Sequence, residues 1–335
     1  MAGVDWIPFG TSSTQSSSDI ETFSGTFNGN GHTIKNLTIT RNTSDTYNFV
    51  GLFGRVSGFI QNLVIKNANI TVKGANPCVG ILCGYVYSET RTPEIKKVSV
   101  SGTITVDHDY KYNEYAFRGV GGLIGSIYNS SKVKMFDCIS KVNINISGDS
   151  QRTCYVGGFI GYGNGVYLTR CYAFGNINVT NTEDTALKIS GMQSLCYNTT
   201  HFSCACAVNI SNALSTTVSE CCKYLTSTSG FTNTGSRKYW VNSSISWESY
   251  SSSSDVSFSE RDMVDIIGAS YTSNYILDNL DFANGKYLKL DIEKESVAYD
   301  ITIGSTTYVG VKKVIYNGTQ INKLVVNTNE YVFGN

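Results

Sequence analysis

Residues 155–177 read YVGGFIGYGNGVYLTRCYAFGNI, and residues 119–144 read GVGGLIGSIYNSSKVKMFDCISKVNI. Both segments begin with Val-Gly-Gly-Leu/Phe-Ile-Gly, pass through a variable turn and end in two short runs of strand-forming residues. Weaker copies begin at residues 49 and 78, and a worn copy begins at residue 187. This self-similarity predicts a stack of equivalent structural units.

Each unit is too short and too polar to bury a hydrophobic core alone, whereas stacked units bury a continuous one. We therefore predict an all-β fold, a right-handed parallel β-helix over residues 1–225. The last glycine of the motif is expected where the chain bends tightly or where neighbouring coils approach closely. These glycines are Gly54, Gly84, Gly125 and Gly161.

The second half of each unit predicts which side chains point inward. Short runs of similar pattern, such as IKNL, IQNL and LTRC, end in an apolar residue or a cysteine. We interpret the ends of these runs as one inward ladder of Leu37, Leu63, Val98, Cys138, Cys171 and Cys204. An isoleucine follows six residues after each of the last four, at Ile104, Ile144, Ile177 and Ile210.

This ladder accounts for several of the ten cysteines, because a thiol among Leu and Val side chains behaves as a small buried hydrophobe. Two alternatives are a disulfide at Cys204 or Cys206 and a zinc cluster. Zinc ligands usually occur in Cys-x2–4-Cys pairs, and Cys204-Ala-Cys206 is closer than that. We expect no metal and no cofactor. The zinc alternative would use Cys196, His201, Cys204, Cys206, Cys221 and Cys222.

Composition excludes some partners. Lys+Arg and Asp+Glu number 26 each, so the chain has no basic excess to neutralise nucleic-acid phosphates. No apolar run reaches the roughly 18 residues of a membrane span. The first ten residues, MAGVDWIPFG, have neither the basic nor the apolar region of a signal peptide. The sequence predicts no nucleic-acid partner, no membrane insertion and no leader.

These motifs resemble a known family, the bacterial and phage-borne proteins that carry the GLUG repeat. The resemblance implies a surface-displayed adhesion or binding module, usually without a catalytic centre of its own. The chain departs from the family by lacking a leader and by its cysteine-rich last coils. Besides the repeated glycine motif, the resemblance rests on Trp6–Gly10, Phe23–Leu37, Tyr239-Trp240, Glu260–Met263 and Asn284–Leu288.

The C-terminal third has a different character. Residues 226–299 are expected to form a cap or strap, with a short helix at 258–267 that begins in a Ser257/Glu260 capping box. Residues 300–335 alternate apolar and polar side chains around Asn317-Gly318, which predicts a small β-hairpin module. This module resembles C-terminal β modules of phage tail and appendage proteins, which favours a virion protein.

Acidic loops follow the second strand of several coils. Stacked coils lie about 4.8 Å apart, so carboxylates from neighbouring loops could reach the separation of about 5–9.5 Å that glycoside hydrolysis uses. The weak catalytic candidates are Asp107, Asp109 and Asp149. The alternatives are an ion or glycan site and a solvated loop edge.

The longest of these loops, DHDYKYNEYAF at residues 107–117, combines aromatic rings with hydrogen-bond acceptors, which suits sugar faces and hydroxyls. Tyr85 and Tyr87 could extend this surface, although the loop could instead fold over its own coil. The candidate binding residues are Asp107, Asp109, Tyr110, Tyr112, Glu114 and Tyr115, with Asp45 and Tyr47 from a neighbouring loop.

We therefore expect a non-enzymatic phage virion appendage or tail-associated protein. Its partner would be a host cell-surface polysaccharide or another virion protein, and analogy favours a homo-oligomer, with a trimer as the expected form. The alternatives are a glycan depolymerase that uses loop carboxylates and a bacterial surface adhesin without its leader.

Overall fold

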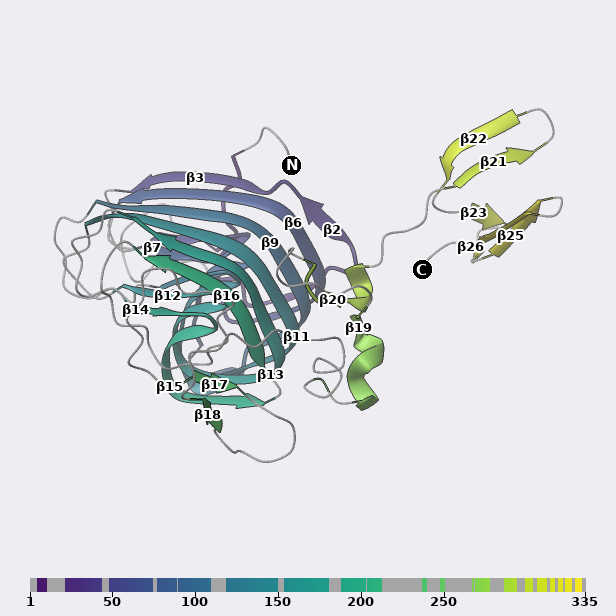
Figure 1. The fold of residues 1–335 in the computed structure, drawn as a ribbon. Helices are drawn as coiled ribbons and strands as arrows, with labels where there is room; N and C mark the ends of the chain where they lie inside the picture. The colour runs from purple at the N-terminus through teal and green to yellow at the C-terminus, as the bar shows by residue number, and fades with distance from the viewer. Residues whose placement is uncertain are drawn as a thin grey trace. The chain divides into compact units, whose positions relative to one another are not determined.

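Parallel strands stacked coil upon coil form the N-terminal part of the protein in a computed structural model (Figure 1). The predicted all-β parallel solenoid is confirmed. The structure describes residues 5–10, 22–43, 48–74, 77–88, 90–109, 119–149, 154–180, 188–202, 204–212, 237–239, 248–250, 267, 269–277, 286–293, 299–303, 306–311, 314–316, 319–321, 323–326 and 329–332.

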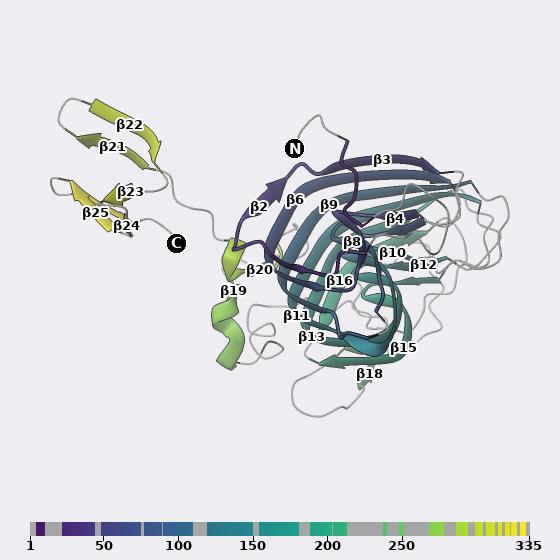
Figure 2. The ribbon, with the colours of Figure 1, turned by 180° about the vertical axis from the view of Figure 1, so that it is seen from behind.

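The larger sheet wraps around most of each coil, and the smaller sheet closes the remaining side (Figures 1 and 2). The larger sheet contains β1 (Thr26–Asn28), β2 (Thr33–Lys35), β3 (Thr38–Thr43), β5 (Phe53–Val56), β6 (Phe59–Gly74), β8 (Cys83–Val86), β9 (Glu94–Asp109), β11 (Ile124–Asp149), β13 (Ile160–Val179), β15 (Gln193–Phe202) and β16 (Ala205–Asn212). The smaller sheet contains β4 (Asn48–Val50), β7 (Pro77–Val79), β10 (Gly119–Gly121), β12 (Tyr155–Gly157) and β14 (Lys188–Ser190).

Two ladders of side chains fill the interior. In the first, Leu63 pairs with Val98 and Cys138 pairs with Cys171, and all four side chains are buried. In the second, the predicted isoleucines stand in strict register and extend two coils toward the N-terminus. This second ladder is Ile39, Ile70, Ile104, Ile144, Ile177 and Ile210, each at most 1% exposed.

The prediction placed Leu37 beside Leu63, and this is wrong. Thr38 pairs with Asn69, so Leu37 lies beside Ala68 instead, although it is buried as expected. The cause is a repeated bend: Asn36 and Asn67 adopt left-handed φ angles of 56° and 55°. The IKNL run at 34–37 therefore matches IKNA at 65–68, and the similarity of IKNL to IQNL is misleading.

A second row of left-handed residues forms a corner of successive coils. The φ angles of Asn62, Lys97, Asp137 and Arg170 lie between 50° and 53°, and the strand register aligns these four positions. Such a conformation costs a non-glycine residue roughly 1–2 kcal/mol, so the packing on both sides of the corner must hold it in place. We call these four residues the corner row.

Gly84, Gly125 and Gly161 occupy points of close approach, as predicted for the motif glycines. A Cβ at Gly84, Gly125 or Gly161 would collide with the backbone of the preceding coil, at Val50, Val79 and Val120 respectively. The second glycine of the motif also faces the core, since a Cβ at Gly122 would collide with the Ser140 hydroxyl. Only glycine allows the two sheets to approach this closely.

Residues Glu293–Asn335 form a second compact unit of antiparallel hairpins. The hairpin predicted at Asn317-Gly318 is confirmed, because Tyr316 pairs with Thr319. The helix predicted at 258–267 lies outside the described residues except for Ile267, which is helical and buried. The hairpins are β21 (Tyr299–Ile303) with β22 (Thr306–Val311), β23 (Val314–Tyr316) with β24 (Thr319–Ile321), and β25 (Lys323–Val326) with β26 (Asn329–Val332).

Candidate functional site

The predicted acidic loop is described only at its base. Asp109 and Asp149 end β9 and β11 and pair in register, so adjacent coils do bring these two carboxylate-bearing residues together. The other candidates, Tyr110, Tyr112, Glu114, Tyr115, Asp45 and Tyr47, lie outside the described residues.

Asp107 is the predicted acid whose side chain the structure describes. Its Oδ2 lies 3.5 Å from Lys73 Nζ, and Ser147 Oγ donates to Oδ1 over 3.5 Å. Lys73 and Ser147 are its neighbours in the two adjacent coils, and its side chain is 43% exposed. An exposed ion pair of this kind contributes about 0–1 kcal/mol, which fits a solvated edge better than a proton-transfer site.

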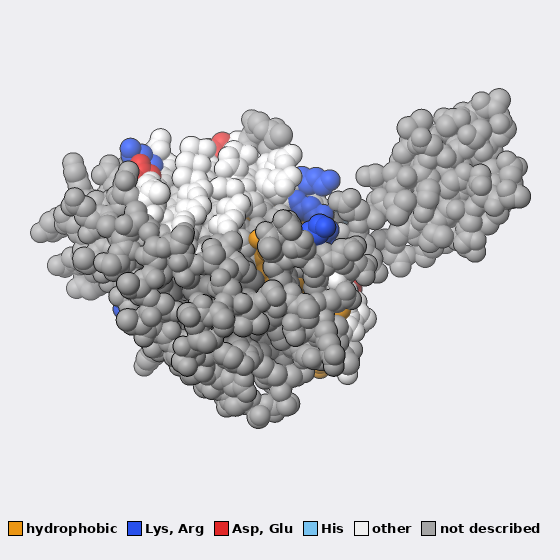
Figure 3. All heavy atoms as spheres, viewed as in Figure 1, with side chains coloured by type: hydrophobic (Ala, Val, Ile, Leu, Met, Phe, Trp, Pro, Cys, Tyr) orange, Lys and Arg blue, Asp and Glu red, His pale blue; other side chains and the backbone are white. Residues whose placement is uncertain are grey.

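Asp107 borders a broad surface on the outside of the isoleucine ladder, which we call the polar face. Its side chains hydrogen-bond from coil to coil: Asn176 Nδ2 donates to Asn143 Oδ1 over 2.8 Å, and Asn178 Nδ2 donates to Asn145 Oδ1 over 3.0 Å. In Figure 3 it contributes to the white area over the upper strands. Its two central rows are Thr38, Asn69, Thr103, Asn143 and Asn176, and Thr40, Thr71, Thr105, Asn145, Asn178 and Ser211.

A different surface follows the glycine motif, on β5, β8 and the first part of β11 and β13. The residue directly after the last motif glycine is Arg55, Tyr85, Ser126 or Tyr162, and these positions pair in register. We call this surface, with the rings that contact it, the tyrosine face. Its residues are Phe49, Arg55, Tyr85, Tyr87, Tyr128, Tyr155, Tyr162 and Lys188.

Four rings of the tyrosine face form a nearly parallel series. Phe49 stacks on Tyr85 with centroids 4.8 Å apart and planes at 12°. The Tyr85–Tyr87 and Tyr87–Tyr128 centroid distances are 6.1 and 6.4 Å, with planes at 11° and 15°. Tyr128 is 38% exposed. The series therefore contains a buried ring, Tyr85, and ends at a ring that solvent reaches. Burial raises the pKa of Tyr85 above its usual range.

Arg55 lies against this series. Its guanidinium carbon is 4.8 Å from the Tyr87 ring centroid and 5.8 Å from that of Tyr85. Its Nε is buried and has no hydrogen-bond partner in the structure, and no described carboxylate forms an ion pair with it. At the other end of the tyrosine face, the exposed Lys188 places its Nζ 5.9 Å from the Tyr155 ring centroid.

Sequence reasoning had singled out Tyr85 and Tyr87 but missed Arg55, Tyr128 and Tyr162. One signal could have found Arg55 and Tyr162, because the residue after the last motif glycine occupies an equivalent position in each coil. Two tyrosines and an arginine share this one position, and Tyr85 is buried there, so the position is informative.

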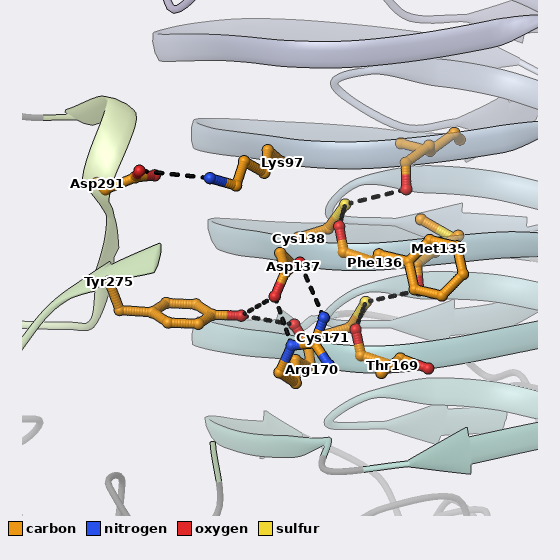
Figure 4. Close-up of polar contacts among 11 residues, drawn as sticks. Lys97, Met135, Phe136, Asp137, Cys138, Thr169, Arg170, Cys171, Tyr275 and Asp291 are labelled. Carbon is orange, nitrogen blue, oxygen red and sulfur yellow. Dashed lines mark hydrogen bonds and ion pairs between the residues drawn. The ribbon is translucent and has the colours of Figure 1, made fainter. Parts of the chain in front are cut away.

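The third surface is covered by the chain itself. We call residues 267–292 the strap. Its described elements are η1 (Ala269–Asn274), β19 (Tyr275–Ile276), β20 (Lys289–Leu290) and the first two residues of η3 (Asp291–Glu293). Tyr275 Oη donates to Asp137 Oδ1 over 2.8 Å and to the Arg170 carbonyl over 3.2 Å (Figure 4). Arg170 in turn forms two hydrogen bonds to Asp137, at 2.6 and 3.0 Å.

Aromatic packing continues along the strap. Tyr275 meets Tyr172 edge to face at 5.8 Å, and Tyr287 stacks on Phe174 at 5.0 Å. Lys97 Nζ lies 3.3 Å from Asp291 Oδ2. The strap therefore crosses β9, β11 and β13 at the corner row and covers aromatic side chains that would otherwise face water (Figure 4).

The cysteines for which the structure describes a side chain are all buried thiols, as the core interpretation predicted. Cys154 Sγ lies 3.6 Å from His108 Nε2, and both residues are buried. Among the described residues, no group of three or more His, Cys, Asp or Glu is placed to hold a metal ion. The described cysteines are Cys78, Cys83, Cys138, Cys154, Cys171, Cys204 and Cys206.

No protein-family model matches the chain. Over 110 residues, 32% of this chain, it is 37% identical to halomucin from Haloquadratum walsbyi, and over 87 residues, 25% of this chain, it is 36% identical to a "Putative Gly-rich membrane protein" from Evansella cellulosilytica. These matches span 1% and 9% of the relatives' own lengths, so this chain corresponds to a small part of each.

The fold is similar to a crystal structure of a "putative immunoglobulin A1 protease" from Bacteroides ovatus. The TM-score is 0.53 with 17% sequence identity, over 88% of this chain and 84% of that one. At this identity the likeness concerns the fold alone. In the described part of the chain, no helix has the length and apolar character needed to cross a membrane.

Proposed function

We propose that the chain is a non-enzymatic recognition module, displayed on a phage particle or a cell surface, that binds a cell-surface polysaccharide through the tyrosine face. The observation that carries the proposal is the nearly parallel series from Phe49 to Tyr128, which is partly open to solvent. Aromatic faces pack against sugar C–H surfaces while phenol hydroxyls hydrogen-bond to sugar hydroxyls.

The solenoid gives these rings a fixed geometry. Tyr85 and Tyr87 follow a glycine that is locked between coils, and parallel register aligns Tyr85 with Ser126 of β11. A ring held in place before binding loses little conformational freedom on contact, so a modest contact area can give useful affinity. The described carboxylate of Asp107 is paired with Lys73, which is why we do not propose it as a catalytic acid or base.

Surface display rests on two further supports. Halomucin and the Gly-rich membrane protein, which share short segments with this chain, carry names that suit a cell surface. The C-terminal hairpins favour attachment to a virion, by their resemblance to phage appendage modules. Mass spectrometry of purified phage particles tests this, since the chain is expected among the virion proteins and its absence would favour a cellular adhesin.

The binding experiment uses purified wall polysaccharide and measures both affinity and released sugar. We expect Tyr87→Ala and Tyr128→Ala each to weaken binding about two- to tenfold, since the loss of one ring contact costs roughly 0.5–1.5 kcal/mol. Thr105→Ala on the polar face is the control and should leave affinity unchanged. If only Thr105→Ala lost binding, the polysaccharide would bind the polar face and not the tyrosine face. If the chain released sugar and Asp107→Asn abolished this release, the protein would be an enzyme.

A further inference from the structure

Among the described residues, Arg55 and Arg170 both contact tyrosine rings but differ in their counter-charge. Arg170 lies under Tyr271 at 3.9 Å and forms two hydrogen bonds to the Asp137 carboxylate. Arg55 lies over Tyr87 at 4.8 Å but forms no ion pair with a described carboxylate. Arg170 therefore shows a complete arrangement of ring, guanidinium and carboxylate, and Arg55 shows the same arrangement without the carboxylate.

The local environment of Arg55 increases its need for an anion. Its Nε is removed from water and has no hydrogen-bond acceptor, which is costly for a charged group. The ring contacts offset part of this cost through cation–π attraction, but they supply no acceptor oxygen. A planar guanidinium pairs best with a carboxylate or a phosphate, which can accept two hydrogen bonds at once.

The charge of the tyrosine face is one-sided. Arg55 and Lys188 are both cations, and the eight residues that define the surface include no Asp or Glu. Three other basic side chains of the described solenoid have an acidic partner: Lys73 pairs with Asp107, Lys97 with Asp291 and Arg41 with Asp5. Arg55 and Lys188 therefore add positive charge to the same surface as the ring series.

We infer that the ligand of the tyrosine face is an acidic polysaccharide, whose carboxylate or phosphate group pairs with Arg55 while an adjacent sugar stacks on Tyr87 and Tyr128. This inference rests on the proposed function and specifies its ligand class. The occupant follows from charge complementarity, since an anionic ligand group would complete at Arg55 the arrangement that Asp137 completes at Arg170.

The test uses two matched probes, polygalacturonic acid and its carboxyl-reduced neutral form, with poly(glycerol phosphate) as the phosphate probe. The full chain should bind at least one acidic probe about tenfold more tightly than the neutral form, and added salt should weaken this preference. The carboxylate and phosphate probes show which anion is favoured. Arg55→Gln should reduce acidic binding to the neutral level, whereas Arg55→Lys should retain part of it.

Lys73→Gln removes a positive charge from the polar face and is the control for net charge, so it should change binding less than twofold. A thermal melt confirms that each variant is folded. Equal binding to acidic and neutral forms, unchanged in Arg55→Gln, would overturn the acidic ligand but leave the tyrosine face as a glycan site. Failure to bind any polysaccharide, wall material included, would overturn the proposed function as well.

Discussion

The strap side and the tyrosine face of the solenoid are built from the same kinds of residue, yet only the first is covered by described chain. Under the strap, Tyr172 and Phe174 pack against Tyr275 and Tyr287. On the tyrosine face, the ring series ends at Tyr128, which is 38% exposed. The comparison indicates that aromatic rows on this fold serve two purposes, to dock a segment of the chain and to receive something from outside.

The charges follow the same division. Arg170 and Asp137 are 11% and 3% exposed in their side chains, and burial of the pair is compensated by Tyr275. Burial alone would lower the pKa of Arg170, but the hydrogen bonds and charge of Asp137 raise it above its ordinary value. Arg55 has no such partner among the described residues. We therefore expect mutations under the strap to lower the free energy of unfolding, and mutations of the tyrosine face to lower the affinity for the ligand.

The largest expected effect comes from the core that both sides share. Cys171→Asp would place an unpaired charge in a fully buried position, so we expect the free energy of unfolding to fall by more than about 4 kcal/mol. Chemical denaturation measures this, and glycan binding should be lost in parallel. Cys171→Val, which matches Val98 in the same ladder, is the control; unchanged stability in the Asp variant would show that Cys171 does not point inward.

Asp137→Ala should cause the next largest loss in the free energy of unfolding, because it leaves Arg170 largely buried without its counter-charge. Breaking such a pair typically costs about 3–5 kcal/mol. The control is Asp5→Ala, which breaks an exposed ion pair to Arg41 and a hydrogen bond from the Thr40 backbone N–H. Because both contacts are exposed, it should cost only about 0.5–2 kcal/mol. Equal losses in the two variants would contradict the distinction between the strap side and the open surface.

Tyr275→Phe sharpens the comparison by removing one hydroxyl from the strap. The hydrogen bond to the Asp137 carboxylate should be worth about 1.5–3 kcal/mol in unfolding free energy, because its acceptor is charged. Tyr271→Phe keeps the ring over Arg170 and alters a residue that is 45% exposed, so it should change stability by less than about 0.5 kcal/mol. Polysaccharide affinity should be unaffected in both variants.

The smallest effect concerns alkaline pH. Burial raises the pKa of Tyr172 and Tyr275 above that of an unfolded tyrosine, about 10. The unfolded chain therefore loses these protons first, so their contribution to stability is complete below pH 10 and declines above it. Denaturation between pH 9 and 11 should show a loss of roughly 1 kcal/mol per buried tyrosine, and Tyr275→Phe should show a smaller loss.

The repetitive part of the fold was predictable because few residue types suit it. The inward isoleucines and the motif glycines each have one physical reason to occupy their positions, namely burial and close backbone approach. The position of Leu37 was mispredicted because Asn62 and Asn67 both bend the chain, so two similar runs competed for the same alignment.

Surface features were harder to predict for a different reason. Nothing in residue type shows that Asp137 and Arg170 adopt left-handed φ angles, because the surrounding packing imposes them. The partner of Asp137, Tyr275, lies 138 residues further along the chain, and no local pattern connects them. Arg55 was not predicted as a site residue because its ring contacts come from residues on another coil, which its local sequence does not indicate.

The contacts between the strap and the corner row also constrain the number of coils in this part of the solenoid. Lys97, Asp137 and Arg170 come from three successive coils, and the strap meets them with Asp291 and Tyr275. Asp137 and Arg170 are 33 residues apart, which is the length of one coil. A coil inserted between Lys97 and Arg170 would move one of these contacts away from the strap. The contacts of the strap therefore fix the number of coils between these two residues.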